Sequence, residues 1–167
     1  MPNKKAQIWG IDLIVGIFIF LMGLIILFFY AVNLKGNTGD IEDISLVGDT
    51  ISENLLSEGT PINWTEENVI FPGLISQNKV NETKLQMFYN LNQDYPKFKG
   101  ILETKYDFYI YFSEPMSLEA GQVDGIGKPN VNRDNIIEHE NPKNIFKVTR
   151  VIAYNNKPVT LNIYLWN

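Results

Sequence analysis

The sequence predicts an α+β protein, in which an N-terminal transmembrane α-helix precedes a small head of one or two helices packed on an antiparallel β-sheet. An apolar run without a charge between residues 13 and 32 predicts the transmembrane helix. Apolar residues three and four positions apart within 41–57 predict a helix of the head. Aromatic and alternating runs in the last third of the chain predict the sheet.

The first apolar run is long enough to cross a lipid bilayer. Twenty helical residues that rise about 1.5 Å each span a hydrocarbon core of about 30 Å. The apolar part of a cleaved secretory signal is shorter, at about 7–15 residues. We therefore expect this helix to stay on the mature protein and to lie in the membrane.

Charges on the two sides of this run predict its orientation. Lys4 and Lys5 precede it, whereas Asp40, Glu42 and Asp43 follow it. Because cytoplasmic flanks carry an excess of Lys and Arg, we expect the N-terminus in the cytoplasm and the head outside.

The segment between the run and the head, NLKGNTGD at 33–40, is predicted to interrupt the helix. It contains Gly36 and Gly39, and glycine is a poor helix former. We expect 33–40 to act as a hinge before a head domain that covers 41–167.

The residues before the apolar run, Lys4-Lys5-Ala6-Gln7, resemble the class III signal peptide of archaeal type IV pilins and pilin-like proteins. This resemblance implies that a prepilin peptidase cuts between Ala6 and Gln7 on the cytoplasmic side. Residues 1–6 are then a leader with Lys4 and Lys5 as its basic residues, and 7–32 form a transmembrane and assembly helix. A second stretch, LLSEGTPINWTEENVIFPGL at 55–74, also resembles a segment found in the heads of this family.

One acid lies inside the apolar helix. Asp12 is the sixth residue after the expected cleavage point, and the family usually has an acid at the fifth. At about 100° per residue, Asp12, Gly16 and Gly23 share one narrow stripe of the helix. Two small residues on one stripe let another helix approach closely, so this stripe is a candidate assembly surface. In the alternative, Asp12 only reaches the headgroups or caps the start of the helix.

The head is predicted to begin with a helix over 41–57, which Gly59 and Pro61 end. A second, shorter helix is indicated by Leu85, Phe88 and Tyr89, with Asn81 placed to cap it.

Three strands are predicted at 106–112, 146–154 and 159–165, and Asn155-Asn156-Lys157-Pro158 predicts a hairpin between the last two. The stretch 113–144, rich in Gly, Pro, Asn and charge, is expected to be an unstructured loop that is either a binding surface or disordered.

No motif of the head predicts a catalytic residue, a metal site or a cofactor. GIGKPN at 125–130 lacks the first glycine and the Ser or Thr of a phosphate-binding loop, so a turn is expected there. Glu138-His139-Glu140 holds the only histidine, and a solvated loop is favoured over a metal or base role. Eight acids and no base between Asp40 and Glu67 are interpreted as the wet face of a helix rather than as a cation site.

Two short motifs are candidate N-glycosylation acceptors. Asn63-Trp64-Thr65 and Asn81-Glu82-Thr83 both fit the acceptor pattern, and an outside head would expose them to the transferase. The capping role expected for Asn81 competes with its modification.

The charge of the chain disfavours one class of partner. The formal net charge is −5 and no basic patch stands out, which disfavours binding to nucleic acid. Together with the resemblance, the sequence predicts a structural subunit that assembles through its N-terminal helix into an archaeal surface filament and displays its head for contact or adhesion. Its expected partners are other copies or other pilin subunits, the prepilin peptidase and the pilus assembly machinery. The alternative is an uncleaved, single-pass anchored domain that binds a ligand or acts as an enzyme through 113–144.

Overall fold

A computed structural model describes the backbone of residues 4–167 and the side chains of residues 12–32 and 40–167. The structure does not describe the side chains of Lys4, Lys5, Ala6 and Gln7. The expected leader and its cleavage point therefore lie outside the described residues. The chain divides into two compact units, Met1–Asp40 and Ile41–Asn167.

Helix α1 covers Lys4–Leu55. Its 21 residues from Asp12 to Val32 are long and apolar enough to cross a membrane. A helix of this length and composition near the N-terminus is a candidate membrane anchor or signal sequence.

The helix break predicted at 33–40 is wrong at the level of secondary structure, because α1 is helical throughout that segment. Gly36 and Gly39 each cost only about 1 kcal/mol relative to alanine within a helix. This cost is small beside the cooperative gain of extending hydrogen-bonded turns from strong helical segments on both sides.

The part of α1 in the second unit packs on the sheet of the head. Ile44, Ile51 and Leu55 are buried at spacings of seven and four, as the apolar pattern predicts. A Cβ added to Gly48 would lie 3.1 Å from side-chain atoms of Phe146, Val148 and Leu165, so this glycine lets helix and sheet approach closely.

Two short helices follow. Helix α2 covers Glu82–Leu91 and α3 covers Tyr95–Ile101. The capping role predicted for Asn81 is confirmed, since its side chain accepts a hydrogen bond from the backbone N–H of Lys84 at 3.1 Å. Asp94 caps α3 in the same way.

The main sheet has four antiparallel strands in the order β6-β3-β8-β7. Strands β3 (Asp107–Phe112), β7 (Ile145–Tyr154) and β8 (Lys157–Trp166) confirm the three predicted strands. The predicted hairpin is also confirmed: β7 pairs with β8 across Asn155 and Asn156, whose φ angles of 50° and 60° are those of a two-residue turn. The α+β class predicted from the sequence is therefore correct.

The stretch 113–144 is ordered into short elements, so its prediction as an unstructured loop is wrong. It contains β4 (Met116–Leu118), β5 (Gly121–Val123), β6 (Ile126–Gly127) and α4 (Ile136–Glu140). Strands β4 and β5 pair with each other, as do β1 (Ile75–Ser76) and β2 (Lys79–Val80) earlier in the chain. The stretch is held by isolated buried side chains, namely Met116, Ile126, Val131 and Ile136. Their irregular spacing gives no periodic signal.

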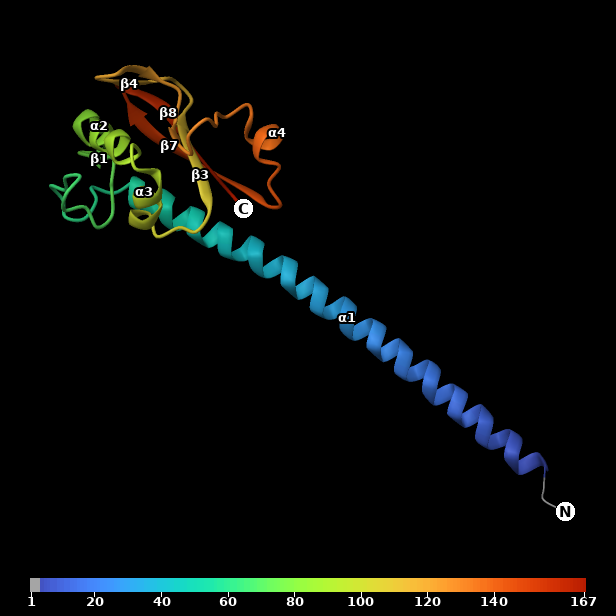
Figure 1. The fold of residues 1–167 in the computed structure, drawn as a ribbon. Coiled ribbons are helices and arrows are strands. Elements are labelled where there is room, and N and C mark those ends of the chain that lie inside the picture. The colour runs from blue at the N-terminus through green and yellow to red at the C-terminus, as the bar shows by residue number, and fades with distance from the viewer. Residues whose placement is uncertain (1–3) are drawn as a thin grey trace. The chain divides into compact units, whose positions relative to one another are not determined.

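The two faces of the main sheet are covered by different elements. The head part of α1 with α2 and α3 lies on one side of the sheet and α4 on the other, as Figure 1 shows within the head. The larger core includes Phe88, Phe98, Phe108 and the inward residues of β8. The smaller one consists of Tyr109, Tyr111, Val131, Ile136 and Trp166.

Candidate functional site

The apolar part of α1 exposes a continuous surface. Its large side chains from Leu13 to Val32 are all exposed in the isolated chain. Asp12, Gly16 and Gly23 are exposed as well, and a Cβ added to either glycine would meet nothing within 4 Å. Apolar surface of this extent is stable only when lipid or other helices cover it. The stripe of Asp12, Gly16 and Gly23 is therefore accessible both to lipid and to another helix.

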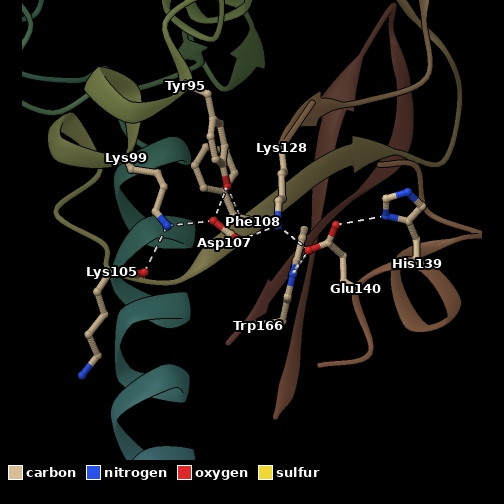
Figure 2. A network of polar contacts seen from close by, with 9 residues as sticks. All are labelled: Tyr95, Lys99, Lys105, Asp107, Phe108, Lys128, His139, Glu140 and Trp166. Carbon is tan, nitrogen blue, oxygen red and sulfur yellow. Dashed lines mark hydrogen bonds and ion pairs between the residues drawn. The ribbon is translucent and has the colours of Figure 1, made fainter. Parts of the chain in front are cut away.

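The head contains a second polar feature, which we call the charge network. It is formed by Tyr95, Lys99, Asp107, Lys128 and Glu140 (Figure 2). Asp107, at the start of β3, accepts hydrogen bonds from Lys99 Nζ at 2.8 Å, from Lys128 Nζ at 2.8 Å and from the Tyr95 hydroxyl at 3.1 Å. The network thus joins α3 to the sheet.

Lys128 extends the network to α4. Its ammonium also pairs with Glu140, which accepts a hydrogen bond from Trp166 Nε1 at 3.4 Å. His139 Nδ1 lies 3.2 Å from the other carboxylate oxygen of Glu140. Two ammonium groups and two carboxylates balance in charge, and they connect α3, β3, α4 and the end of β8. The charges of the network therefore compensate each other within the head.

The protonation equilibria of the carboxylates follow from these contacts. Burial alone would raise the pKa of Asp107, but the hydrogen bonds from Lys128 and Lys99 outweigh it and the pKa lies below its ordinary value. The hydrogen bond from Lys128 likewise lowers the pKa of Glu140. Tyr111 lies on the same face of the sheet as Asp107. Burial raises the pKa of Tyr111, and this effect outweighs the opposing charge of Lys147.

We expect the head to lose stability in acid through this network. A carboxyl group with a lowered pKa in the folded state stabilises the fold fully above its ordinary pKa, here 3.8 for Asp107 and 4.5 for Glu140. That stability is lost as the pH falls through the lower folded-state values. The free energy of unfolding of Glu140→Gln should be about 1 kcal/mol below that of wild type at pH 6.

The difference should narrow at pH 3, because below the ordinary pKa of 4.5 the carboxyl of unfolded wild-type protein is protonated and the charged contact adds less to stability. The matched control is Glu138→Gln, an exposed acid on the same helix that makes no contact with Lys128. Urea unfolding followed by tryptophan fluorescence at both pH values measures the effect. An equal loss in Glu138→Gln and Glu140→Gln would contradict it.

The charge network is not predicted by the sequence. Lys128 is expected in a turn and Glu138-His139-Glu140 in a solvated loop, but the latter residues belong to α4, which brings Glu140 to Lys128. The loop prediction is wrong because Ile136 is buried against the outer face of the sheet and holds the segment there. No local signal links a lysine to an acid twelve residues later in a non-helical stretch.

The acidic run from Asp40 to Glu67 lies mostly on the solvated surface, as predicted. Two of its members make contacts across the head. Asp43 accepts a hydrogen bond from the Tyr106 hydroxyl at 2.7 Å and pairs with Lys105, and Asp49 pairs with Arg150 at 2.9 Å. In the described parts of the chain, no three His, Asp or Glu side chains gather into a group that could hold a metal ion.

The two candidate glycosylation acceptors differ in their surroundings. Asn63 is exposed, while the adjacent Trp64 is buried and donates from Nε1 to the carbonyl of Gly73 at 3.1 Å. Asn81 is half-buried and its side chain caps α2. Attachment of a glycan at Asn81 would compete with this cap, so Asn63 is the better placed acceptor.

The comparisons with protein-family models, with curated proteins and with solved structures give no match for this chain.

Proposed function

We propose that this chain is a pilin-like structural subunit of an archaeal type IV pilus-like surface filament. Its N-terminal helix packs with the helices of other copies or other pilin subunits, and its head is displayed outside the cell for contact. The observation that carries the proposal is the order of features at the N-terminus. Lys4-Lys5-Ala6-Gln7 directly precedes an apolar helix of membrane-spanning length that bears one acid on a glycine stripe.

The exposed stripe on α1 supports assembly through this helix. Asp12 is costly in a bilayer, by about 2.5–3.5 kcal/mol at the centre and less near an end. A partner that pairs with the acid removes much of this cost. Gly16 and Gly23 leave open space beside it, which allows close packing of a second helix.

The properties of the head agree with a displayed domain. The lysines before the helix and the acids after it favour a cytoplasmic N-terminus and an outside head. Several charges of the head pair with each other, and its acidic balance disfavours nucleic acid. We therefore assign it a role in contact or adhesion, without a substrate or a cofactor, and with Asn63 as the preferred site for a glycan.

The second candidate is an uncleaved, single-pass membrane anchor whose head binds a ligand or acts as an enzyme. A helix of this composition serves an anchor equally well. The two functions differ in processing, since a pilin loses its leader and an anchor keeps it.

The first test is therefore the N-terminus of the mature protein. We expect the protein, expressed in a host with an archaeal prepilin peptidase, to begin at Gln7. Intact-mass measurement and N-terminal sequencing of the membrane fraction check this. Replacing Ala6 with phenylalanine should leave the full-length precursor, because the cleavage pattern needs a small residue. Ala6→Gly is the matched control and should be processed. Met1 or Pro2 at the terminus of the wild-type protein would favour the anchor.

A further inference from the structure

One edge of the main sheet is long, and among the described residues no strand forms backbone hydrogen bonds with it; β2 lies close to it only at the end next to the turn. Strand β7 is the last in the order β6-β3-β8-β7 and has ten residues. The other edge, β6, has two. A long open edge presents a row of backbone donors and acceptors that another strand can pair with.

The register of the hairpin identifies the outward-pointing groups. The two-residue turn makes Tyr154 and Lys157 a hydrogen-bonded pair. Every second residue of β7 from there therefore bonds to β8, and the residues between them point their N–H and C=O groups away from it. These outward residues are Ile145, Lys147, Thr149, Val151 and Ala153. Among the described residues, no backbone hydrogen bond outside the helices and strands reaches them.

The two charged side chains of β7, Lys147 and Arg150, are not placed to prevent another strand from pairing with this edge. Natural edge strands are often protected by charged side chains that discourage pairing. Here the ammonium of Lys147 lies over the rings of Tyr164 and Tyr111, at 5.2 and 5.9 Å from their centroids. Arg150 is drawn to Asp49 on the opposite face. The residue after Arg150, Val151, is 72% exposed, more than any other large apolar side chain of the head.

We propose that β7 pairs with β7 of a second copy of this chain, antiparallel and about a two-fold axis at Thr149. This register uses the whole strand. It places Lys147 opposite Val151 and Val148 opposite Arg150, so that no two like charges face each other. Moving the axis to Arg150 would place two arginines opposite each other.

A groove at one end of β7 adds a second, self-complementary feature. It has a volume of about 620 Å³ and lies between this end of β7 and the β1–β2 hairpin. Its apolar lining is Leu56, Ile75, Val151, Ile152, Ala153 and Pro158, and its polar lining is Asn78, Lys79, Asn156 and Lys157. In the proposed register Ala153 faces Ile145 of the second copy. Ile145 is itself an exposed apolar residue at the other end of the same strand. Each copy thus offers the groove at one end of β7 and the side chain that enters it at the other, as a two-fold contact requires.

This pairing goes beyond the proposed filament, because it uses only the head and would occur in an anchored, uncleaved protein as well. It joins two four-stranded sheets into one and removes the open edge.

Cysteine cross-linking tests the register, since the chain has no cysteine of its own. In the proposed dimer the two Thr149 residues form a hydrogen-bonded pair with Cα atoms about 5.5 Å apart, a distance that a disulfide spans. The full-length Thr149→Cys protein in detergent should form disulfide-linked dimers under mild oxidation. Val151→Cys should not cross-link to itself, because the two copies of that residue would lie about 14 Å apart along the strands.

A mixture of Val151→Cys and Lys147→Cys proteins should form the mixed dimer, since these positions face each other. Gln122→Cys, exposed on β5, measures random collision. A yield for Thr149→Cys several-fold above that for Gln122→Cys is the expected result. Equal yields for Thr149→Cys, Val151→Cys and Gln122→Cys, or no dimer, would overturn the proposal.

The cross-link at Thr149→Cys should persist when Asp12→Ala is added. Its persistence would separate pairing of the heads from assembly through α1, so that either can fail alone. Loss of the cross-link in the double variant would overturn pairing as a property of the head.

Discussion

The Asp12→Ala protein is expected to insert and to be processed like wild type, or to insert better, and to lose most of its self-association in the membrane. Processing at Gln7 would create an α-amine that is charged at neutral pH and lies next to lipid. In the proposed assembly, Asp12 of one subunit pairs with this amine of its neighbour, and each charge offsets the desolvation of the other. Removing one member of a buried, hydrogen-bonded charge pair costs about 2–5 kcal/mol, which weakens association by about 30-fold or more.

Co-purification of differently tagged copies from the same membranes measures this effect. Leu21→Ala is a matched control, because Leu21 lies about 180° around the helix from Asp12 and should associate normally. Gly16→Leu tests the same stripe without changing a charge and should also weaken association, since it fills the open space beside the acid. If Asp12→Ala associates as well as wild type, Asp12 is an interfacial residue and the helix assembles by other contacts.

Replacing Ile163 with alanine is expected to lower the free energy of unfolding of the head by about 2–5 kcal/mol. Ile163 is fully buried at the centre of β8 and lies between Ile110 of β3 and Val148 of β7 in the sheet register. The change removes buried methyl and methylene groups and leaves a cavity that neighbours on two strands cannot close.

Ile137→Ala is the matched control for this variant. It is the same chemical change at a position on α4 that is 69% exposed, so its effect should stay within about 0.5 kcal/mol. Urea unfolding of the full chain in mild detergent, followed by tryptophan fluorescence, measures both variants. Similar values for the two would mean that β8 does not face the core through Ile163.

Local pattern was enough where one periodicity or one cap determines the structure. The alternation from Val159 to Leu165 predicted β8 and the face that it turns to the larger core. The expectation that β8 is half-buried is wrong, because Asn162 and Trp166 on its other face are buried as well. Asn155-Asn156 predicted the turn, since both residues tolerate positive φ. The position of Asn81 before an apolar helical pattern predicted that it caps α2, because a cap depends only on residues within one turn.

The stripe on α1 could also be predicted from spacing, because the side chains of a helix follow from their positions alone. The helix itself was predicted to end too early. Glycine at 33–40 disfavours a helix locally, but the adjoining helical residues provide enough stability to keep α1 continuous.

By itself, the sequence determined the α+β class, the membrane-length helix with Asp12 on its glycine stripe and the three long strands, because each depends on neighbours within a few positions. Only the tertiary structure decided that residues 113–144 fold into short strands and a helix, that the charge network forms, and that β7 is an edge strand. The pairing of Lys128 with Glu140 and of both lysines with Asp107 requires α3, β3 and α4 to meet. Which strand lies at an edge depends on the order in which the strands pair. Contacts between residues far apart in the chain carry no periodic signal, since the sheet that brings them together is itself the product of folding.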